Sequence, residues 1–229
     1  KVRKSSCNGT TGLWSQTLSF SITSPSVDYV STNATGNNDG SSWQDAFTNI
    51  EDALNSFSVG SEIWVASGIY TPANGTGRKK TFNLPNGTKL YGGFNGTETS
   101  ISQRNPSINI TVLSGDLNGD DNSTITDQES TRQDNSYHII SLKGVVNDVV
   151  VDGFTLSGAN ANGTSLTTGN AIFQYRDDRG GAVYAFPYSI GHVQDAKFVN
   201  CIFKNNSGLY GALYAQSVPT NVNNLESNI

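Results

Sequence analysis

Pairs of similar segments recur in the stretch from Val149 to Tyr214. An apolar run with an internal glycine, Val149–Gly158, is followed by a similar run, Val193–Phe203. Each is followed by a segment that starts with glycine and ends with tyrosine, Gly180–Tyr184 and then Gly211–Tyr214. Short β-type segments that recur after about 30 residues are typical of chains that stack successive coils of strands. The repeat therefore predicts a coiled β-structure, with a β-sandwich as the alternative.

The charge pattern disfavours nucleic acid as a partner, and the lengths of the apolar runs disfavour insertion into a membrane. Charged residues make up 14% of the chain and the formal net charge is -5, without a stripe of lysine or arginine. This disfavours a nucleic-acid surface. The one basic cluster, Arg78–Lys80, is interpreted as a solvated turn. No run of 18 apolar residues occurs in the sequence, so we expect no direct insertion into a membrane.

One amphipathic helix is expected before the strands. Its apolar positions recur at helical spacing and are Trp43, Phe47, Ile50, Leu54 and Phe57. Ser42 and Asp45 resemble a capping box at its start. Such a helix would cover the open apolar end of the first coil. Few helical periods follow, which favours an all-β fold over a doubly wound α/β sheet.

The chain divides into three parts. Residues 1–23 contain an alternating strand pattern and resemble the last hairpin of a fibronectin type III domain. Residues 24–27 are expected to be a linker, and residues 28–229 the main domain. The sequence stops without an element that would cap the last coil, which predicts a domain truncated at its C-terminal end. We therefore expect one part of a longer, multidomain chain.

Several segments of the main domain resemble a known family. Asp39–Phe47 and Glu62–Pro72 look like the opening of a pectin-lyase-like right-handed parallel β-helix, and Tyr91–Thr99 continues the match. Gly180–Val183 and Phe203–Asn206 are similar to repeats of polymorphic outer membrane proteins. The resemblance implies a right-handed parallel β-helix with one N-terminal capping α-helix, located outside the cell or on a bacterial cell surface. It does not imply an activity, because the superfamily contains lyases, hydrolases, adhesins and inert stalks.

A polar segment, Asp116–Asp127, carries oxygen-bearing side chains at the alternating positions that a calcium loop uses. The expected Ca²⁺ ligands are Asp116, Asn118, Asp120, Asn122, Thr124 and Asp127. The glycine stands at position four of the segment and an aspartate at position twelve, so the loop resembles a dockerin-type loop more than an EF-hand. The alternative interpretation is an acidic, solvated insertion between coils.

Other candidate ligand-binding residues lie near the second repeat. Phe186 and Tyr188, on either side of Pro187, are expected to form an exposed aromatic platform for sugars. Asp177 and Asp178 are adjacent carboxylates, but neighbours on a strand point to opposite faces, and the following glycines predict a turn. The pair therefore does not predict a catalytic acid and base.

Two further residue types are interpreted structurally. His138 lies in a strand pattern and is expected to be a packed or hydrogen-bonded imidazole. Cys7 and Cys201 are far apart and have no metal-ligand spacing. Cys201 is expected to be a buried free thiol, with a disulfide to Cys7 as the alternative.

Three functions remain open from the sequence. The first is a non-catalytic secreted or cell-surface module, as in a large adhesin, that binds carbohydrate or another cell-surface protein through the loops between coils. The second is a polysaccharide lyase or glycosidase, and the third a purely structural stalk. The missing carboxylate pair and the scarcity of basic residues disfavour the enzyme.

Overall fold

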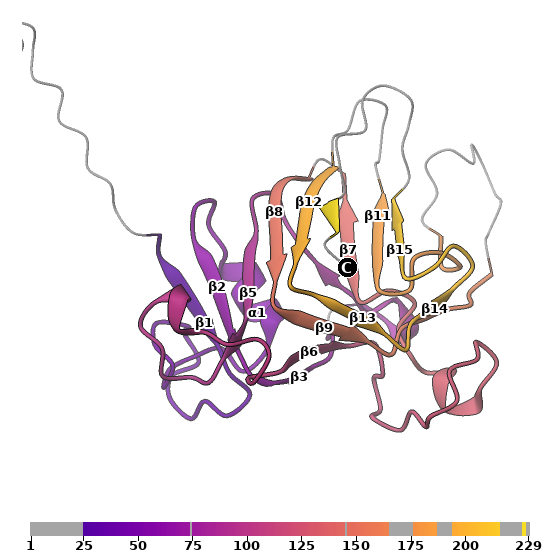
Figure 1. Ribbon diagram of the computed structural model, residues 1–229, viewed down its shortest axis with the longest axis horizontal. Coiled ribbons are helices and arrows are strands. Elements are labelled where there is room, and N and C mark those ends of the chain that lie inside the picture. The colour runs from indigo at the N-terminus through magenta and orange to yellow at the C-terminus, as the bar shows by residue number, and fades with distance from the viewer. Residues whose placement is uncertain are drawn as a thin grey trace, which may run out of the picture.

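The computed structural model describes residues 25–73, 75–144, 146–164, 176–186, 194–215 and 226–227. Within them the strands form four parallel sheets, A to D (Figure 1). Helical structure in these residues is limited to the α-helix α1 (Ile50–Ser56) and the 3-10 helices η1 (Gly77–Lys79), η2 (Ile101–Gln103) and η3 (Ser130–Arg132). None of these helices is long and apolar enough to cross a bilayer. The expectation of an all-β fold is confirmed.

Within each sheet, strands that neighbour one another in space are far apart in the sequence. In spatial order, sheet A contains β1 (Val27–Val30), β2 (Glu62–Ala66), β5 (Lys89–Phe94), β8 (Val146–Asp152), β12 (Gln194–Val199) and β16 (Glu226–Ser227). Sheet B contains β13 (Ile202–Lys204), β9 (Phe154–Ser157), β6 (Thr111–Ser114) and β3 (Gly68–Tyr70). Sheet C contains β15 (Leu213–Ala215), β11 (Val183–Phe186), β7 (Ile140–Lys143) and β4 (Phe82–Asn83). Sheet D pairs β10 (Asn160–Ala161) with β14 (Ser207–Gly208).

The order in which the chain enters the sheets repeats. From β2 onward it passes through sheet A, sheet B and sheet C, and then returns to sheet A one strand further along. Figure 1 shows β1, β2, β5, β8 and β12 side by side in this order. Neighbouring parallel strands need a crossover connection. In this chain the strands of the other two sheets make the crossover, where α/β proteins use helices. The parallel pairing differs from the antiparallel pairing of a β-sandwich.

The repeated segments of the sequence lie next to each other. In sheet C, Tyr184 of β11 pairs with Tyr214 of β15. In sheet A, Val151 of β8 pairs with Phe198 of β12. The prediction that these repeats stack on one another is confirmed, because equivalent residues one repeat apart occupy adjacent strands.

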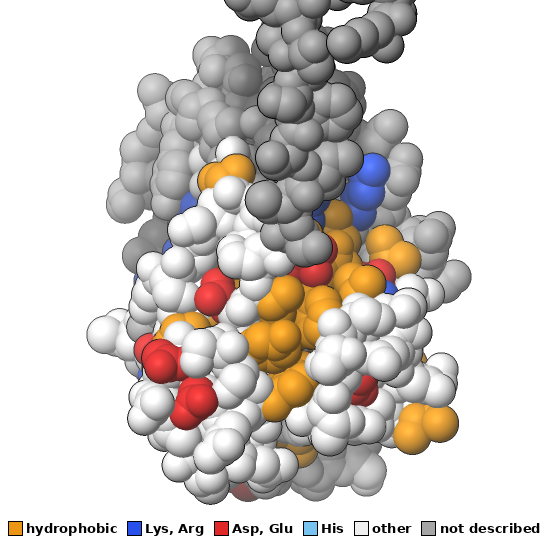
Figure 2. Space-filling model, turned by 90° about the vertical axis from the view of Figure 1, so that its left-hand side faces the viewer, with side chains coloured by type: hydrophobic (Ala, Val, Ile, Leu, Met, Phe, Trp, Pro, Cys, Tyr) orange, Lys and Arg blue, Asp and Glu red, His pale blue; other side chains and the backbone are white. Residues whose placement is uncertain are grey.

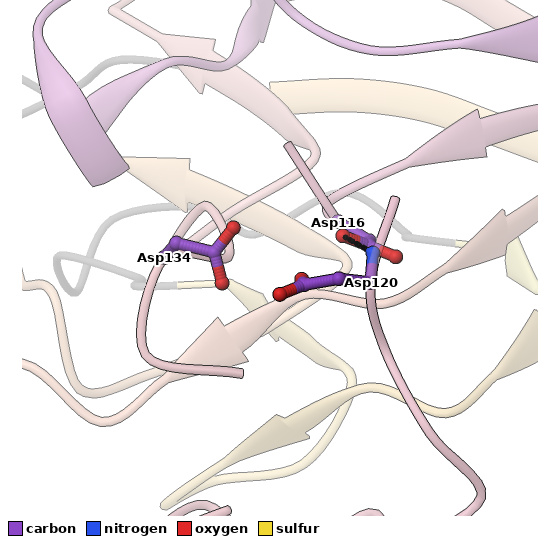
Figure 3. Close-up of side chains that lie close together, drawn as sticks. All are labelled: Asp116, Asp120 and Asp134. Atoms are coloured by element: carbon purple, nitrogen blue, oxygen red, sulfur yellow. Dashed lines mark hydrogen bonds between the residues drawn. The ribbon is translucent and has the colours of Figure 1, made fainter. Parts of the chain in front are cut away.

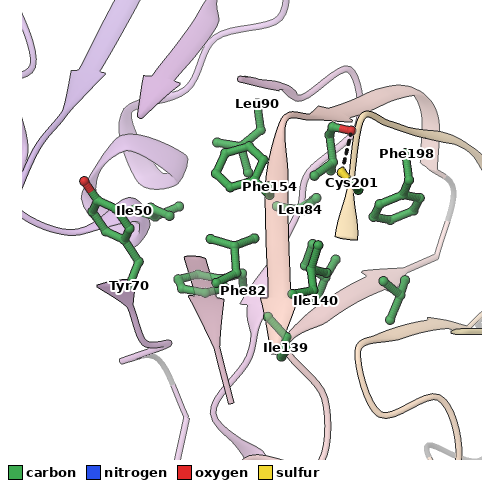
Figure 4. Close-up of a cluster of buried hydrophobic side chains, with 14 of the residues drawn as sticks. Ile50, Tyr70, Phe82, Leu84, Leu90, Ile139, Ile140, Phe154, Phe198 and Cys201 are labelled. Carbon is green, nitrogen blue, oxygen red and sulfur yellow. Dashed lines mark hydrogen bonds between the residues drawn. The ribbon is translucent and has the colours of Figure 1, made fainter. Parts of the chain in front are cut away.

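The hydrophobic core lies between the three large sheets (Figure 4). Sheet A contributes Leu90, Val151 and Phe198 in one row of paired positions. Sheet C adds Phe82, which pairs with Ile140 on the next strand. Burying each large apolar side chain stabilises the fold by about 1.5–3 kcal/mol. Rows of apolar residues on neighbouring strands therefore stabilise the stacking of one repeat of the chain on the next.

The helix begins later than the sequence predicted. Its N-cap is Asn49, whose side chain accepts a hydrogen bond from the Asp52 backbone N–H. Ser42 and Asp45 do exchange hydrogen bonds, but they do not cap a helix, because α1 begins only at Ile50. Phe47 instead forms a parallel β-bridge with Val30 at the end of β1. The prediction of a helical start at Trp43 was wrong because the backbone of Phe47 pairs with a strand.

Helix α1 lies against the first strands of two sheets. It contacts β1 and β2 of sheet A and β4 of sheet C, and Ile50 and Ala53 are buried in the core. Figure 2 looks onto the end of the molecule at which β1 lies and shows hydrophobic side chains gathered in its middle. Helix α1 therefore packs at this end of the molecule, and part of the apolar surface of that end stays exposed.

Several sequence predictions fall outside the described residues. These are the fibronectin-like segment 1–23, with Cys7, and the aromatic residue Tyr188. At the linker, β1 begins at Val27, one residue before the expected start of the main domain.

Candidate functional site: an acidic loop and a polar groove

The connection between β6 and β7, residues 115–139, contains the predicted calcium segment and is called the acidic loop. Its first turn folds around the carboxylate of Asp116. One oxygen, Oδ1, accepts hydrogen bonds from the backbone N–H of Gly119 at 2.7 Å and of Asp120 at 3.3 Å. The other, Oδ2, accepts one from Asp121 at 3.2 Å. Asp116 therefore positions the residues that follow it.

Three carboxylates of this loop, from Asp116, Asp120 and Asp134, meet at one point (Figure 3). Each offers an oxygen that lies within 4.8 Å of the other two. Oδ2 of Asp134 is buried and has no hydrogen-bond partner among the described residues. Burial raises the pKa of Asp134, and the charges of Asp120 and Asp116 raise it further. Three carboxylates at this spacing repel one another unless a proton or a cation balances them.

The six expected ligands separate in the structure. Asp116 and Asp120 join the cluster, whereas Asp127 lies at a different place, the polar groove beside the loop. Asn122 accepts a hydrogen bond from the Thr124 backbone N–H and donates one to Glu129. Asn118 and Thr124 are both exposed.

Sequence reasoning missed Asp134. It approaches the cluster from the far end of the loop, and no local spacing rule relates it to Asp116. Only the path of the whole loop brings the two side chains together.

A buried arginine fastens the acidic loop to the sheets. The side chain of Arg132 is fully buried, and its Nη1 donates to Oδ2 of Asp121 at 3.0 Å. Its Nη2 donates to the carbonyl oxygens of Ala159 and Asn205 at 2.8 and 2.9 Å. These carbonyls belong to the turns that follow β9 and β13. One guanidinium therefore joins the loop to two successive passes of the chain.

Asn135 completes this network from the next turn of the loop. Its Nδ2 donates to both carboxylate oxygens of Asp121 and to the carbonyl of Gly158. Burial raises the pKa of Asp121, while Asn135 and Arg132 oppose that rise. The carboxylate of Asp121 is thus engaged inside the protein and faces different partners from its neighbour Asp120.

Arg78 makes a second connection, contrary to the expectation of a solvated turn. It donates to the carbonyls of Asn135 and Asn160, and to Oδ1 of Asn162, each at 2.7 Å. Its guanidinium also lies 4.3 Å from the centre of the Tyr137 ring. Two arginines therefore hold the acidic loop: Arg132 of the loop donates to carbonyls outside it, and Arg78 donates to the carbonyl of Asn135 within it.

Beside the acidic loop is a polar groove with a volume of about 490 Å³. The small sheet of β10 and β14 runs along it, since Ala161, Ser207 and Gly208 are among its lining residues. The complete lining among the described residues is Asp127, Ala161, Asn162, Gly163, Asp178, Ser207, Gly208 and Leu209. The groove thus combines two carboxylates with backbone and short side chains, and Asp127 belongs to both the groove and the acidic loop.

Asp178 is fixed in the groove by its neighbours. Arg176 donates two parallel hydrogen bonds to its carboxylate, at 3.0 and 2.9 Å, and Arg179 lies 3.7 Å away. The hydrogen bond from Arg176 lowers the pKa of Asp178, so its carboxylate is ionised at neutral pH. Asp177 lies instead beside Lys79, at 3.5 Å, and burial raises its pKa. The two residues occupy the predicted turn, but only Asp178 lines the groove.

The expectation of an exposed aromatic platform was wrong for Phe186, which is only 2% exposed. This residue lies in β11, where all four side chains are buried, and its ring stacks against Tyr184. The exposed aromatic ring near the groove is Tyr210, which is 53% exposed and carries the guanidinium of Arg179 4.4 Å from its centre. It follows Leu209 in the turn after β14.

The interpretations of His138 and Cys201 are confirmed. His138 is buried, stacks on Tyr184 at 4.7 Å, and its Nδ1 lies 3.0 Å from the carbonyl of Gly180. Burial lowers the pKa of His138 to about 4, so its ring is neutral at pH 7. Cys201 is a buried free thiol whose pKa burial raises to about 11. Neither residue offers a reactive group at the surface.

No protein-family model, curated protein or solved structure matches the chain.

Proposed function

We propose that this chain is a right-handed parallel β-helix module of an exported protein, located at a bacterial cell surface, which binds carbohydrate without converting it. The repeated passage through sheets A, B and C supports the β-helix, since parallel crossovers are right-handed in almost all proteins. The position of α1 against β1, β2 and β4 supports a capping role for the helix.

The observation that carries the binding function is the groove beside sheet D. It is a concave site whose lining combines polar side chains with exposed Leu209, and Tyr210 follows in the same turn. Recognition sites for small molecules combine polar groups at fixed positions with apolar surface in this way. A pyranose ring presents both kinds of surface, because its hydroxyl groups surround apolar C–H faces.

The state of Asp178 favours binding over hydrolysis. A glycosidase needs two carboxylates on either side of the scissile bond, one of which carries a proton. Arg176 keeps Asp178 ionised, and Asp177, the neighbour with the raised pKa, does not line the groove. We therefore favour binding over the lyase or glycosidase alternative.

A glycan array combined with an assay for new chain ends tests this function. We expect binding to carbohydrate and no new reducing or unsaturated ends after incubation with the bound glycan. New ends would show an enzyme. If the array retains no glycan, the remaining functions are a structural stalk or the binding of a protein partner.

A second proposal concerns the cluster of Asp116, Asp120 and Asp134, which we propose to hold Ca²⁺. Carboxylate oxygens are the ligands that this ion prefers. The buried, unpartnered Oδ2 of Asp134 supports an ion there. Bound Ca²⁺ would offset two of the three negative charges and fix the loop that supplies Asp127 to the groove.

Calorimetric titration of metal-stripped protein with Ca²⁺ tests this site. We expect heat of binding that Asp134→Asn strongly reduces and that Asp148→Asn, which removes an exposed carboxylate of β8, leaves intact. Absence of heat with millimolar Ca²⁺ would exclude the site.

A further inference from the structure

The charges on the groove indicate which carbohydrates it can accept. Among its described lining residues, the charged side chains are those of Asp127 and Asp178, both acidic. Arg176 donates its hydrogen bonds to that carboxylate, Arg179 donates to the hydroxyl of Tyr214, and neither arginine is part of the lining. A uronate residue in this groove would therefore meet two like charges, with no cation among the described lining residues. That arrangement is unfavourable.

The hydrogen-bond donors of the groove are already used. The amide of Asn162 donates to the Asp127 carbonyl at 2.7 Å and to Gln133 at 3.2 Å. The hydroxyl of Ser207 donates to Oδ1 of Asn160 at 2.7 Å. The backbone N–H of Gly163 donates to Asp177, and that of Leu209 to Asp178. What remains for a ligand is mainly the acceptor capacity of two carboxylates, so the ligand must supply the donors.

The backbone at Asp127 and the carboxylate of Asp178 are also held in place before a ligand arrives. The carbonyl of Asp127 accepts hydrogen bonds from Asn160, Asn162 and Gln133, at 3.0, 2.7 and 2.9 Å. Arg176 fixes Asp178 through two hydrogen bonds. Groups that are already ordered lose less entropy when a ligand binds. The groove thus presents carboxylate acceptors, suited to hydroxyl donors, on a backbone that is already ordered.

Apolar surface next to these acceptors completes the site. Leu209 is 71% exposed and lines the groove, and Tyr210 follows it in the same turn. Aromatic and aliphatic side chains pack well against the C–H face of a sugar ring. The uncharged pyranose, with hydroxyls at its edge and C–H groups on its face, fits both surfaces.

From these observations, we infer that the groove binds a neutral oligosaccharide, whose hydroxyl groups donate to Asp127 and Asp178, and that it rejects polyuronates. This inference rests on the proposed carbohydrate-binding function and specifies its ligand class. Asn162 and Gln133 are positioning residues because they hold the backbone of Asp127, and Arg176 is one because it holds the carboxylate of Asp178.

Calorimetry with oligosaccharides of matched length tests this inference. The neutral probes are gluco-, xylo- and manno-oligosaccharides, and the acidic probes are oligogalacturonate and oligomannuronate, all with the full chain and Ca²⁺ present. We expect at least one neutral series to bind, with the acidic series at least about tenfold weaker. Raising the salt concentration should leave the neutral binding almost unchanged, because no ligand charge is involved.

Matched variants assign the binding to the groove. Asp127→Asn should weaken the neutral ligand about tenfold, because a hydrogen bond to a charged acceptor is replaced by one to an amide. Asp148→Asn, outside the groove, should leave the affinity unchanged. The side chain of Asp127 is exposed, so this variant is expected to fold, which thermal unfolding verifies.

Tighter binding of an oligouronate would overturn the neutral ligand class and leave the carbohydrate-binding function standing. Binding of neutral ligands that Asp127→Asn does not weaken would overturn the assignment to this groove. Absence of binding to every probe would overturn both the inference and the function on which it rests.

Discussion

Replacing Arg132 by methionine tests how the acidic loop is attached to the sheets. The substitution keeps an unbranched side chain but removes the hydrogen bonds to Asp121, Ala159 and Asn205. The carboxylate of Asp121, 16% exposed, would then lose its cationic partner, and two carbonyls would lose a donor. Removing one partner of a buried ion pair costs about 3–5 kcal/mol. We expect a loss of this size in the free energy of unfolding, measured with urea.

A lysine on the surface provides the control for this substitution. Lys204→Met in β13 also removes a positive charge, but its side chain is exposed, so the free energy of unfolding should change by less than about 0.5 kcal/mol. Adding Asp121→Asn to Arg132→Met should restore part of the lost stability, because the unpaired buried charge disappears. A loss of less than about 1 kcal/mol in Arg132→Met would refute the proposed attachment.

Other substitutions test individual features by urea unfolding. In metal-free protein, Asp134→Asn should raise the free energy of unfolding at pH 7: the raised pKa of Asp134 makes its ionised form unfavourable in the folded state. The gain should vanish below the unfolded pKa of about 3.9, and a gain independent of pH would contradict the assignment. Because the pKa of His138 is lowered, the free energy of unfolding of the wild-type protein should fall by up to about 3 kcal/mol as the pH falls from about 6.5 to about 4. His138→Phe should abolish this pH-dependent loss. A loss that persists in the variant must come from other groups. Gly153→Ala should lower the free energy of unfolding more than Gly96→Ala, although both glycines have positive φ. A Cβ at residue 153 would lie 2.6 Å from Nη1 of Arg104, whereas one at residue 96 would meet no atom within 4 Å. Equal costs would mean that the close approach at Gly153 is unimportant.

The sequence predicted those parts of the fold that depend on local patterns. The apolar runs around Val151 and Phe198 became paired strands, because alternation and glycine spacing act within a few residues. The start of the helix was mispredicted because Phe47 has a partner, Val30, that helical spacing does not consider. Tertiary pairing overrode the local signal in that segment.

The candidate site was less predictable for a similar reason. The spacing of Asp116 and Asp120 indicated a cation loop, but the third carboxylate, Asp134, reaches them only through the fold of the loop. The groove depends on residues from separate connections, so no single motif marks it. Phe186 was expected to be exposed because it precedes a proline, whereas its strand is buried along its whole length.

The central claim, that the groove beside sheet D is a binding site for neutral carbohydrate, is tested most directly by nuclear magnetic resonance. Backbone amide signals would be followed while a neutral oligosaccharide that binds in calorimetry is added. We expect the largest shifts at Gly163, Ser207, Gly208 and Leu209, which line the groove. Shifts concentrated elsewhere, such as on the strands of sheet A, with these four amides unchanged, would contradict the claim.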